Sequence, residues 1–271
     1  MLHTKEIKNV SIIGMGALGV MYGSHLAHHM GFDHVTYIMD EKRYEKCKGS
    51  TVTCNGEKLS FTCVPASQAV PADLVIVAVK STGLTEALDT MKNCIGPDTV
   101  ILSVMNGISS EEIIGERYGA EHMIYAVAQG MDAMKFGAEL TYSKMGVLCI
   151  GARLESQQEG LDRVCCLFDR TELPYVREKN ILHRLWSKFM LNVGVNQTCM
   201  VYSCTYGDVW RPDKERDTMI GAMREVIAVA NAEALICPNP TWKNTTGSSA
   251  RSVQTEHHPW DRTALPDDTL K

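Results

Sequence analysis

Three glycines in one short stretch constrain the fold of this chain more than any other feature. They have the spacing Gly14-x-Gly16-x-x-Gly19; a β-branched run that starts after Asn9 precedes them, and a helical pattern follows. In this setting the first glycine permits a tight turn, the second lets the backbone approach a pyrophosphate, and the third lets the helix pack against the strand. The helix N-terminus offers N–H donors to an anion. The motif therefore predicts a dinucleotide-binding loop.

Strand and helix patterns alternate after this loop. Two continuous apolar runs, at 73–79 and 99–105, are typical of strands buried on both faces of a parallel sheet. The expected strands cover residues 34–39, 73–79, 99–105, 122–128 and 174–176, and the expected helices cover 84–94, 110–118 and 161–168. This alternation predicts an α/β fold of the Rossmann type, a doubly wound and mostly parallel sheet with right-handed crossovers.

Two polar residues follow the buried runs directly. Lys80 comes after the run at 73–79, and Asn106, with Gly107, comes after the run at 99–105. In doubly wound sheets, ligands bind outside the carboxyl ends of the strands, so both side chains are expected on the cofactor side. Each is also consistent with an ordinary polar residue that ends a strand.

The second expected strand ends at an acidic residue. Asp40 lies 21 residues after Gly19, where a carboxylate can accept hydrogen bonds from the adenosine ribose of NAD(H). A carboxylate repels the 2′-phosphate of NADP(H), but Lys42 and Arg43 follow at once and can bind that phosphate. The phosphate state of the cofactor stays open, as does the reading of Asp40 as a plain loop residue.

A polar stripe interrupts the apolar stretch from Trp186 to Asn196. Its members are Lys188, Asn192 and Asn196. On an α-helix, their i, i+4, i+8 spacing points all three side chains into a sector of roughly 80°. An amine and two carboxamides on an apolar surface can bind an oxygen and protonate it. The solvated face of an ordinary amphipathic helix produces the same spacing.

The character of the chain changes to long helical patterns from residue 181 onward. One helix is expected over 181–197 and another over 214–235. A core-facing stripe runs along the second, made of Met219, Met223, Val226, Ile227, Ala230 and Ala234. We expect a dinucleotide-binding domain at 1–177, an all-α substrate domain at 178–240 and an atypical, poorly ordered tail at 241–271, with small ligands in a cleft between the domains.

Composition excludes several classes of partner. The formal net charge of −5 gives no reason to expect nucleic acid or an anionic membrane. There is no run of about 18 apolar residues, and the first eight residues are too polar for a signal peptide, so a cytoplasmic protein is expected. The ten cysteines form no CxxC pair and no histidine accompanies them at ligand spacing, so they read as buried thiols and no metal is expected.

With these residues in hand, the chain resembles the ketopantoate reductase family of the 6-phosphogluconate-dehydrogenase-like superfamily over roughly residues 7–238. The motifs that carry the resemblance are Gly14-Met-Gly-Ala-Leu-Gly19, Val79-Lys80, Asn106-Gly107, Trp186-Ser-Lys188-Phe-Met-Leu-Asn192-Val-Gly-Val-Asn196 and Tyr206-Gly207. The resemblance implies NAD(P)H-dependent reduction of 2-dehydropantoate to pantoate, a step of pantothenate and coenzyme A biosynthesis.

The resemblance also assigns roles to residues. Lys188 matches the catalytic lysine, Asn192 and Asn196 match substrate-binding asparagines, and Lys80 and Asn106 match residues near nicotinamide and substrate. The expected cofactor site consists of Gly14, Met15, Gly16, Ala17, Leu18, Gly19, Asp40, Lys80 and Asn106. NADPH is the expected cofactor. NADH is the alternative, because family members commonly carry an arginine for the 2′-phosphate of NADPH near the position that Asp40 occupies here.

Three functions remain open at this point. The first is reduction of ketopantoate, and the second is action on another 2-keto or 2-hydroxy acid. The third is nucleotide binding with little catalysis, because the serine and glutamate motifs of the family's last helices have no match after Thr241. Either a divergent tail or a truncated or frame-shifted C-terminal domain would explain this. The sequence is compatible with a homodimer.

Overall fold

The computed structural model describes residues 5–233, and these form two units. The first extends to Leu185, and the second starts at Trp186, within helix α6 (Ile181–Leu191). This division lies eight residues beyond residue 177, where the sequence placed the boundary. The first turn of α6 belongs to the first unit because Ile181 and Leu185 pack with Tyr125, Val127 and Cys149. The expected tail, 241–271, lies outside the described residues.

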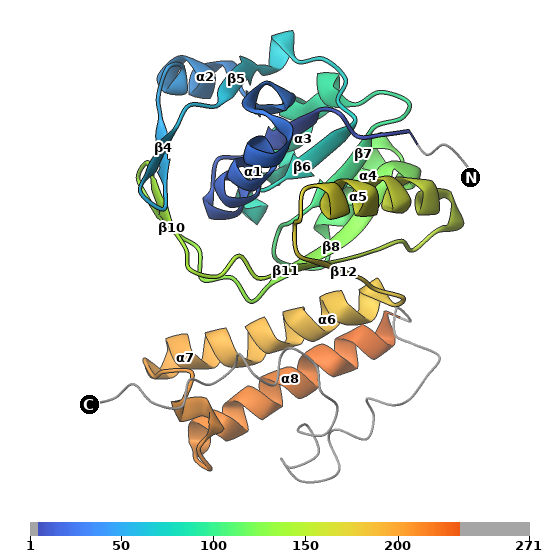
Figure 1. Ribbon diagram of the computed structural model, residues 1–271. Coiled ribbons are helices and arrows are strands. Elements are labelled where there is room, and N and C mark those ends of the chain that lie inside the picture. Colours follow the sequence, from blue (N-terminus) through green and yellow to red (C-terminus); the bar gives the residue numbers. More distant parts are fainter. Residues whose placement is uncertain (1–4, 234–271) are drawn as a thin grey trace. The chain divides into compact units, whose positions relative to one another are not determined.

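An eight-stranded sheet forms the centre of the first unit, with the strand order β12-β11-β8-β7-β6-β1-β2-β5 (Figure 1). The strands are β1 (Val10–Ile13), β2 (Val35–Met39), β5 (Thr62–Pro65), β6 (Leu74–Val77), β7 (Val100–Ser103), β8 (Met123–Gln129), β11 (Val147–Gly151) and β12 (Tyr175–Arg177). Every neighbouring pair is parallel except β8 and β11. The six strands from β5 to β8 have the order of a Rossmann sheet, which confirms the predicted fold class.

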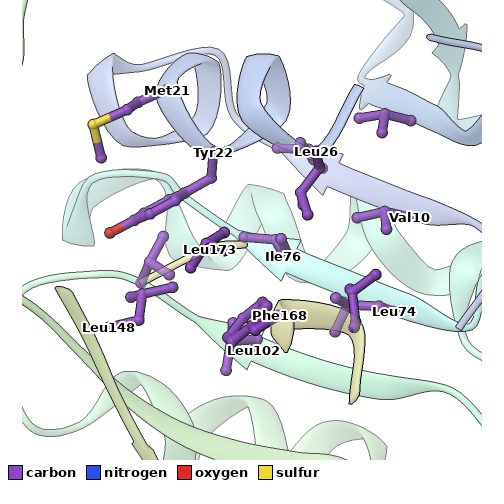
Figure 2. Packing of buried hydrophobic residues seen from close by; sticks show 14 of the residues in the cluster. Val10, Met21, Tyr22, Leu26, Leu74, Ile76, Leu102, Leu148, Phe168 and Leu173 are labelled. Atoms are coloured by element: carbon purple, nitrogen blue, oxygen red, sulfur yellow. The ribbon is translucent and has the colours of Figure 1, made fainter. Parts of the chain in front are cut away.

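Helices cover both faces of this sheet. They are α1 (Ala17–Met30), α2 (Glu41–Cys47), α3 (Leu84–Met91), α4 (Ser110–Tyr118) and α5 (Gln158–Arg170). Alternate strand residues point to opposite faces, so Ile12 packs in the cluster with α1 and α5, whereas Ile13 packs in the cluster with α3 and α4. Figure 2 shows the first of these clusters, which brings together Tyr22 of α1, Ile76 of β6, Leu148 of β11 and Phe168 of α5.

A second, four-stranded sheet was not predicted from the sequence. Its order is β4-β3-β10-β9, and its strands are β3 (Val52–Cys54), β4 (Glu57–Leu59), β9 (Met134–Phe136) and β10 (Glu139–Thr141). Strands of three residues are too short to display a period. One signal was available: Asn55 and Gly56, with φ of 48° and 86°, form the two-residue turn between β3 and β4, and Asn-Gly strongly favours such hairpins.

Helices make up the described part of the second unit, residues 186–233. After the part of α6 that starts at Trp186 come a π-helical turn, η7 (Asn192–Asn196), then α7 (Gln197–Tyr202), a short 3-10 turn, η8 (Asp208–Trp210), and α8 (Lys214–Ala232). The apolar stripe predicted on α8 is buried at Met219, Val226 and Ala230. Ala234 of that stripe lies outside the described residues. An all-α second half was predicted and is confirmed.

Candidate functional site

The glycine loop lies at the topological switch point of the sheet. β1 has β2 on one side and β6 on the other, and the loop leaves the carboxyl end of β1. Gly14 has a φ of 107°, and a Cβ there would lie 2.6 Å from the carbonyl oxygen of Ala78, which follows β6. A Cβ on Gly19 would lie 2.0 Å from the carbonyl oxygen of Gly14. Only glycine fits at these two positions, as the motif predicted.

Gly16 is the N-cap of α1 and leaves the start of the helix open. Its backbone is extended, and neither a side-chain cap nor an acidic residue occupies the first turn of α1. The N–H groups of Ala17, Leu18 and Gly19 are among those that an α-helix cannot pair internally. Met15 and Ala17 are half-buried beside them. This end of α1 has the open backbone donors and the positive dipole end that a pyrophosphate needs.

Tyr37 and Gly23 stabilise the glycine loop at Gly19, and neither was predicted from the sequence. The Tyr37 hydroxyl donates a hydrogen bond to the carbonyl oxygen of Gly19 at 2.8 Å, and the side chain is fully buried. A Cβ on Gly23 would lie 2.0 Å from that hydroxyl oxygen. The available signal was the second glycine four residues after Gly19, on the same face of α1.

Asp40 follows β2 and is the N-cap of α2. Its Oδ1 accepts a hydrogen bond from the backbone N–H of Arg43 at 2.9 Å, and its Oδ2 lies 3.9 Å from the Arg43 Nε. The sequence assigned Asp40 to the ribose but did not anticipate this capping contact. The carboxylate remains half-exposed at the carboxyl end of β2, next to β1 in the sheet. Lys42 and Arg43 are exposed in the first turn of α2.

Lys80 and Asn106 follow two neighbouring strands. β6 and β7 are parallel, with Val77 opposite Ser103, so both residues lie beyond the same edge of the sheet. Both are exposed. Gly107, at φ 112°, lets the chain turn directly after Asn106. The structure therefore places the glycine loop, Asp40, Lys80 and Asn106 at the carboxyl ends of adjacent strands, as topology predicted.

The polar stripe of the second unit differs from the straight α-helix that was predicted over 181–197. Lys188 lies in α6, whereas Asn192 and Asn196 are the first and last residues of the π-helical turn. In an α-helix each step of four residues overshoots a full turn by about 40°. The wider π turn, closed by i→i+5 bonds, rotates less per residue, so Asn196 points closer to the direction of Lys188 than it would on a straight α-helix.

Gly194 lies at the middle of the π turn and packs against α8. A Cβ there would lie 2.6 Å from Cγ of Met223 and 3.3 Å from the backbone oxygen of Met219. The absent side chain thus lets the backbone of η7 approach α8 closely. π turns are rare and often occur at functional sites, so this turn favours the functional interpretation of the stripe over that of a solvated helix face.

Hydrogen bonds join the two asparagines of the stripe. The Nδ2 of Asn196 donates to Oδ1 of Asn192 at 3.4 Å, and the Tyr206 hydroxyl donates to Oδ1 of Asn196 at 2.6 Å. These two hydrogen bonds orient both carboxamides. On the apolar side, Trp186 is buried and its ring contacts that of Phe189 edge-on, with centroids 6.0 Å apart. Lys188, which lies between Trp186 and Phe189 in the sequence, is half-buried.

Residues 5–233 contain neither a metal-binding cluster nor a membrane-spanning helix. No group of three or more histidine, cysteine or acidic side chains there is arranged to hold a metal ion. The nine cysteines in this part of the chain carry free thiols. None of the helices there has the length and apolar character needed to cross a membrane.

The glycine loop at the switch point of a Rossmann sheet defines the first unit as a dinucleotide-binding domain. The family model described as ketopantoate reductase PanE/ApbA matches residues 10–154, and the model for the C-terminal part of that family matches residues 180–259. The chain therefore belongs to the ketopantoate reductase family of oxidoreductases. The second match extends past residue 238, where the resemblance was expected to end.

Individual relatives agree with this assignment. A 2-dehydropantoate 2-reductase of Streptococcus pyogenes is 23% identical over 236 residues, which cover 83% of this chain and 75% of the relative. The structure of 2-dehydropantoate 2-reductase from Geobacter metallireducens has a TM-score of 0.72 at 21% identity and covers 89% of this chain and 84% of its own.

Two further solved structures have the same fold. A D-mandelate dehydrogenase in complex with NADH has a TM-score of 0.74 at 19% identity, over 86% of this chain and 76% of its own. A dimeric ketopantoate reductase from Staphylococcus aureus has a TM-score of 0.67 at 21% identity, over 89% of this chain and 80% of its own. At these identities the likeness concerns the fold alone.

Proposed function

We propose that this protein reduces 2-dehydropantoate to pantoate, with a nicotinamide dinucleotide as reductant, in the biosynthesis of pantothenate and coenzyme A. The observation that carries the proposal is the stripe of Lys188, Asn192 and Asn196, two of whose members form a hydrogen-bonded pair. It occurs in a chain of the ketopantoate reductase family, within the part that the C-terminal family model matches.

The first unit fits a dinucleotide. Gly14 and Gly19 give the tight loop, and the N–H groups at the start of α1 have no competing side-chain cap among the described residues. These groups would bind the pyrophosphate, Asp40 would accept hydrogen bonds from the adenosine ribose, and Lys80 and Asn106 would bind near the nicotinamide. When bound, the dinucleotide supplies a hydride to the carbonyl carbon of the substrate.

Lys188 is the proposed general acid. Negative charge develops on the carbonyl oxygen of a keto acid as its carbon is reduced. An ammonium group within hydrogen-bond reach stabilises that charge and delivers the proton that makes the hydroxyl group of the product. Lysine has three rotatable donors and can release a proton, so it suits both tasks.

Asn192, Asn196 and Asn106 are the proposed substrate-binding residues. A carboxamide has two donor hydrogens and one acceptor oxygen, so it can bind the carboxylate and the hydroxyl group of the substrate. Tyr206 occupies Oδ1 of Asn196. This contact directs the amide hydrogens of Asn196 away from Tyr206, toward Asn192 and toward the position where an acidic substrate would bind.

The cofactor is proposed to be NADPH, the reductant that the family resemblance implies. Lys42 and Arg43 are exposed beside Asp40 and can bind a 2′-phosphate. NADH is the alternative, and the negative charge of Asp40 favours it. The NADH complex of the structurally similar D-mandelate dehydrogenase shows that this fold also accommodates the unphosphorylated cofactor.

A second candidate function is reduction of a different 2-keto acid. The same D-mandelate dehydrogenase motivates it, because that enzyme shares the fold but its name specifies an aromatic 2-hydroxy acid. The amine and carboxamides of the stripe recognise the keto and carboxylate groups common to both substrate classes. They do not select the rest of the substrate.

The test is turnover followed by nicotinamide absorbance, with ketopantoate and with phenylglyoxylate, and with NADPH and NADH. We expect ketopantoate to give the higher kcat/KM. Lys188→Ala should lower kcat by about 10²–10⁴-fold while dinucleotide affinity is retained. Lys188→Arg keeps the positive charge but donates no proton at neutral pH, so it should restore little of the lost rate.

The control for these variants is Lys179→Ala, which removes an exposed lysine just before α6. It should behave as the unaltered protein. Full activity of Lys188→Ala would exclude the mechanism, and binding of dinucleotide without turnover of either keto acid would exclude both candidate reactions in favour of a nucleotide-binding protein.

A homodimer is the proposed state of assembly, by analogy with the dimeric enzyme from Staphylococcus aureus. Sedimentation of the full chain at micromolar concentration would distinguish a dimer from a monomer. The other proposed partner is the small keto acid itself.

A further inference from the structure

A buried carboxylate lies beneath the loop that carries Asn106. Glu111, the second residue of α4, is only 1% exposed, and its pKa is raised from 4.5 to about 7 because burial penalises the charged form. Its Oε1 has no hydrogen-bond partner among the described residues. A fully buried carboxyl group with one unpaired oxygen destabilises the fold, so packing alone does not explain its presence.

Glu111 ends a directed chain of hydrogen bonds. The Ser110 hydroxyl donates to Oε2 of Glu111 at 2.7 Å, and the hydroxyl oxygens of Ser103 and Ser110 lie 2.8 Å apart. When the carboxyl group is ionised, the proton of Ser110 is committed to it, so Ser103 is then the donor in that second contact. The backbone N–H of Met105 then donates to the Ser103 hydroxyl oxygen at 3.4 Å.

These contacts clamp both ends of one loop. Residues 104–109 connect β7 to α4, and Ser103 and Ser110 lie at the two ends of that connection. The hydroxyl–hydroxyl bond closes it, and the carboxylate holds the hydroxyl groups in one orientation. Asn106 is exposed within this loop, next to Gly107, whose positive φ allows the turn.

The carboxylate also acts on the neighbouring strand. The backbone N–H of Ala126, in β8, lies close enough to the carboxyl group to lower its pKa, although burial raises it by more. The pairing of β7 with β8 ends at Leu102 and Ile124, two residues before Ala126. Glu111 thus lies beside β8, beyond the last residue pair that joins β7 to β8.

We propose that Glu111 is a positioning residue that holds the loop 104–109, and with it Asn106, in place at the carboxyl end of β7. The catalytic consequence rests on the proposed function, because the role of Asn106 in binding keto acid or nicotinamide is itself proposed. Glu111 touches neither. It acts through Ser110 and Ser103.

Substitution of Glu111 separates positioning from stability. Glu111→Leu removes the acceptor at the end of the chain but also removes a buried carboxyl group, so its thermal midpoint should equal or exceed that of the unaltered protein. Its kcat/KM for the keto acid should nevertheless fall about 10- to 100-fold, since small misplacement of a binding group is costly. Glu111→Gln keeps an acceptor oxygen for Ser110 and should restore most of the activity.

The matched control is Glu112→Leu, one residue further along α4. The Glu112 side chain is 47% exposed and pairs with Arg153 at 3.0 Å, away from the two serines. This variant should retain both activity and loop protection. If Glu111→Leu does not fold, Ser110→Ala provides the same test, because it interrupts the chain and leaves the carboxylate in place.

Hydrogen–deuterium exchange of the full chain tests positioning without reference to turnover. The amides of residues 104–110 should exchange at least about tenfold faster in Glu111→Leu or Ser110→Ala, and at the original rate in Glu111→Gln and Glu112→Leu. Unchanged exchange in the first two variants would overturn the inference. If the loop loosens but the unaltered protein reduces no keto acid, the proposed function fails and the positioning role stands.

Discussion

The hydroxyl group of Tyr206 donates a hydrogen bond to Oδ1 of Asn196 at 2.6 Å. Tyr206 lies outside the helical run that carries the polar stripe, in the segment between α7 and α8. Through this contact it determines which face of the Asn196 carboxamide carries the amide hydrogens, and Asn196 in turn donates to Asn192. The orientation of the proposed substrate site therefore depends on a residue outside the stripe.

Removal of that hydroxyl group should weaken substrate binding. Tyr206→Phe leaves the ring and frees Asn196 to rotate, so the KM for ketopantoate should rise about two- to tenfold, the range that one hydrogen bond accounts for, with a smaller change in kcat. Steady-state kinetics measures this. Tyr202→Phe is the control, since its hydroxyl group pairs with Thr218 instead. Equal effects of the two variants would contradict the assignment.

Six of the eight strands of the main sheet could be predicted because each carries its own signal, whereas β5 and β11 were not predicted. The buried runs that became β6 and β7 are apolar on both faces, and α4 begins at Ser110 and ends at Tyr118 as its pattern indicated. The second sheet could not be predicted, because its three-residue strands owe their existence to contacts between segments distant in sequence, such as β3 with β10. The Asn55-Gly56 turn between β3 and β4 is the one local signal in the sequence that indicates the second sheet.

The site shows the same division. The glycine loop and the carboxyl-end positions of Lys80 and Asn106 follow from local motifs and strand order. The π turn does not, because a spacing of four residues fits an α-helix equally well, and the close approach of Gly194 to Met223 is a contact between separate helices. Glu111 gives no sign in the sequence that its carboxylate is buried.

Asp40 should control the choice of nicotinamide cofactor. Asp40→Asn removes the negative charge but preserves an N-cap acceptor for the Arg43 N–H, so α2 should remain intact. The ratio of kcat/KM for NADPH to that for NADH should increase about tenfold, because repulsion of the 2′-phosphate is relieved. Glu41→Gln is the control, as this carboxylate accepts from the Ser67 N–H. An unchanged ratio in Asp40→Asn would mean that the 2′-position of the adenosine ribose does not bind near Asp40.

Two buried tyrosines should respond in opposite ways to the loss of their hydroxyl groups. Tyr22 lies in the main core (Figure 2), and its hydroxyl group has no hydrogen-bond partner among the described residues. The Tyr37 hydroxyl, in contrast, donates a hydrogen bond to the carbonyl oxygen of Gly19. Tyr22→Phe should leave the free energy of unfolding unchanged or raise it by up to about 1 kcal/mol, and Tyr37→Phe should lower it by about 1 kcal/mol. Urea titration measures both.

Tyr37→Phe should have a second effect that Tyr22→Phe lacks. Its hydroxyl group supports the carbonyl of Gly19 at the glycine loop, so the Kd for the dinucleotide should rise severalfold. Isothermal titration calorimetry with the dinucleotide provides the measurement. If both variants bind the dinucleotide as the unaltered protein does, the Tyr37 contact serves stability alone.

The buried carboxyl group of Glu111 should make stability depend on pH in a defined window. Its pKa is about 7 in the folded protein against an ordinary value of 4.5, so between these values the folded state retains a proton that the unfolded state has released. Stability is therefore highest below pH 4.5 with respect to this group, and it falls as the pH rises toward 7. Each pKa unit corresponds to about 1.4 kcal/mol, which gives a loss of about 3 kcal/mol.

Glu111→Gln isolates this contribution, because an amide does not titrate in the window. Urea midpoints measured between pH 4.5 and 8 should fall less steeply for the variant than for the unaltered protein, so the variant should be the more stable of the two above pH 7. Glu112→Gln, which removes an exposed carboxylate from the same turn of α4, should follow the unaltered protein. Parallel curves for Glu111→Gln and the unaltered protein would mean that the carboxyl group is ionised throughout and that the chain of serines stabilises its charge.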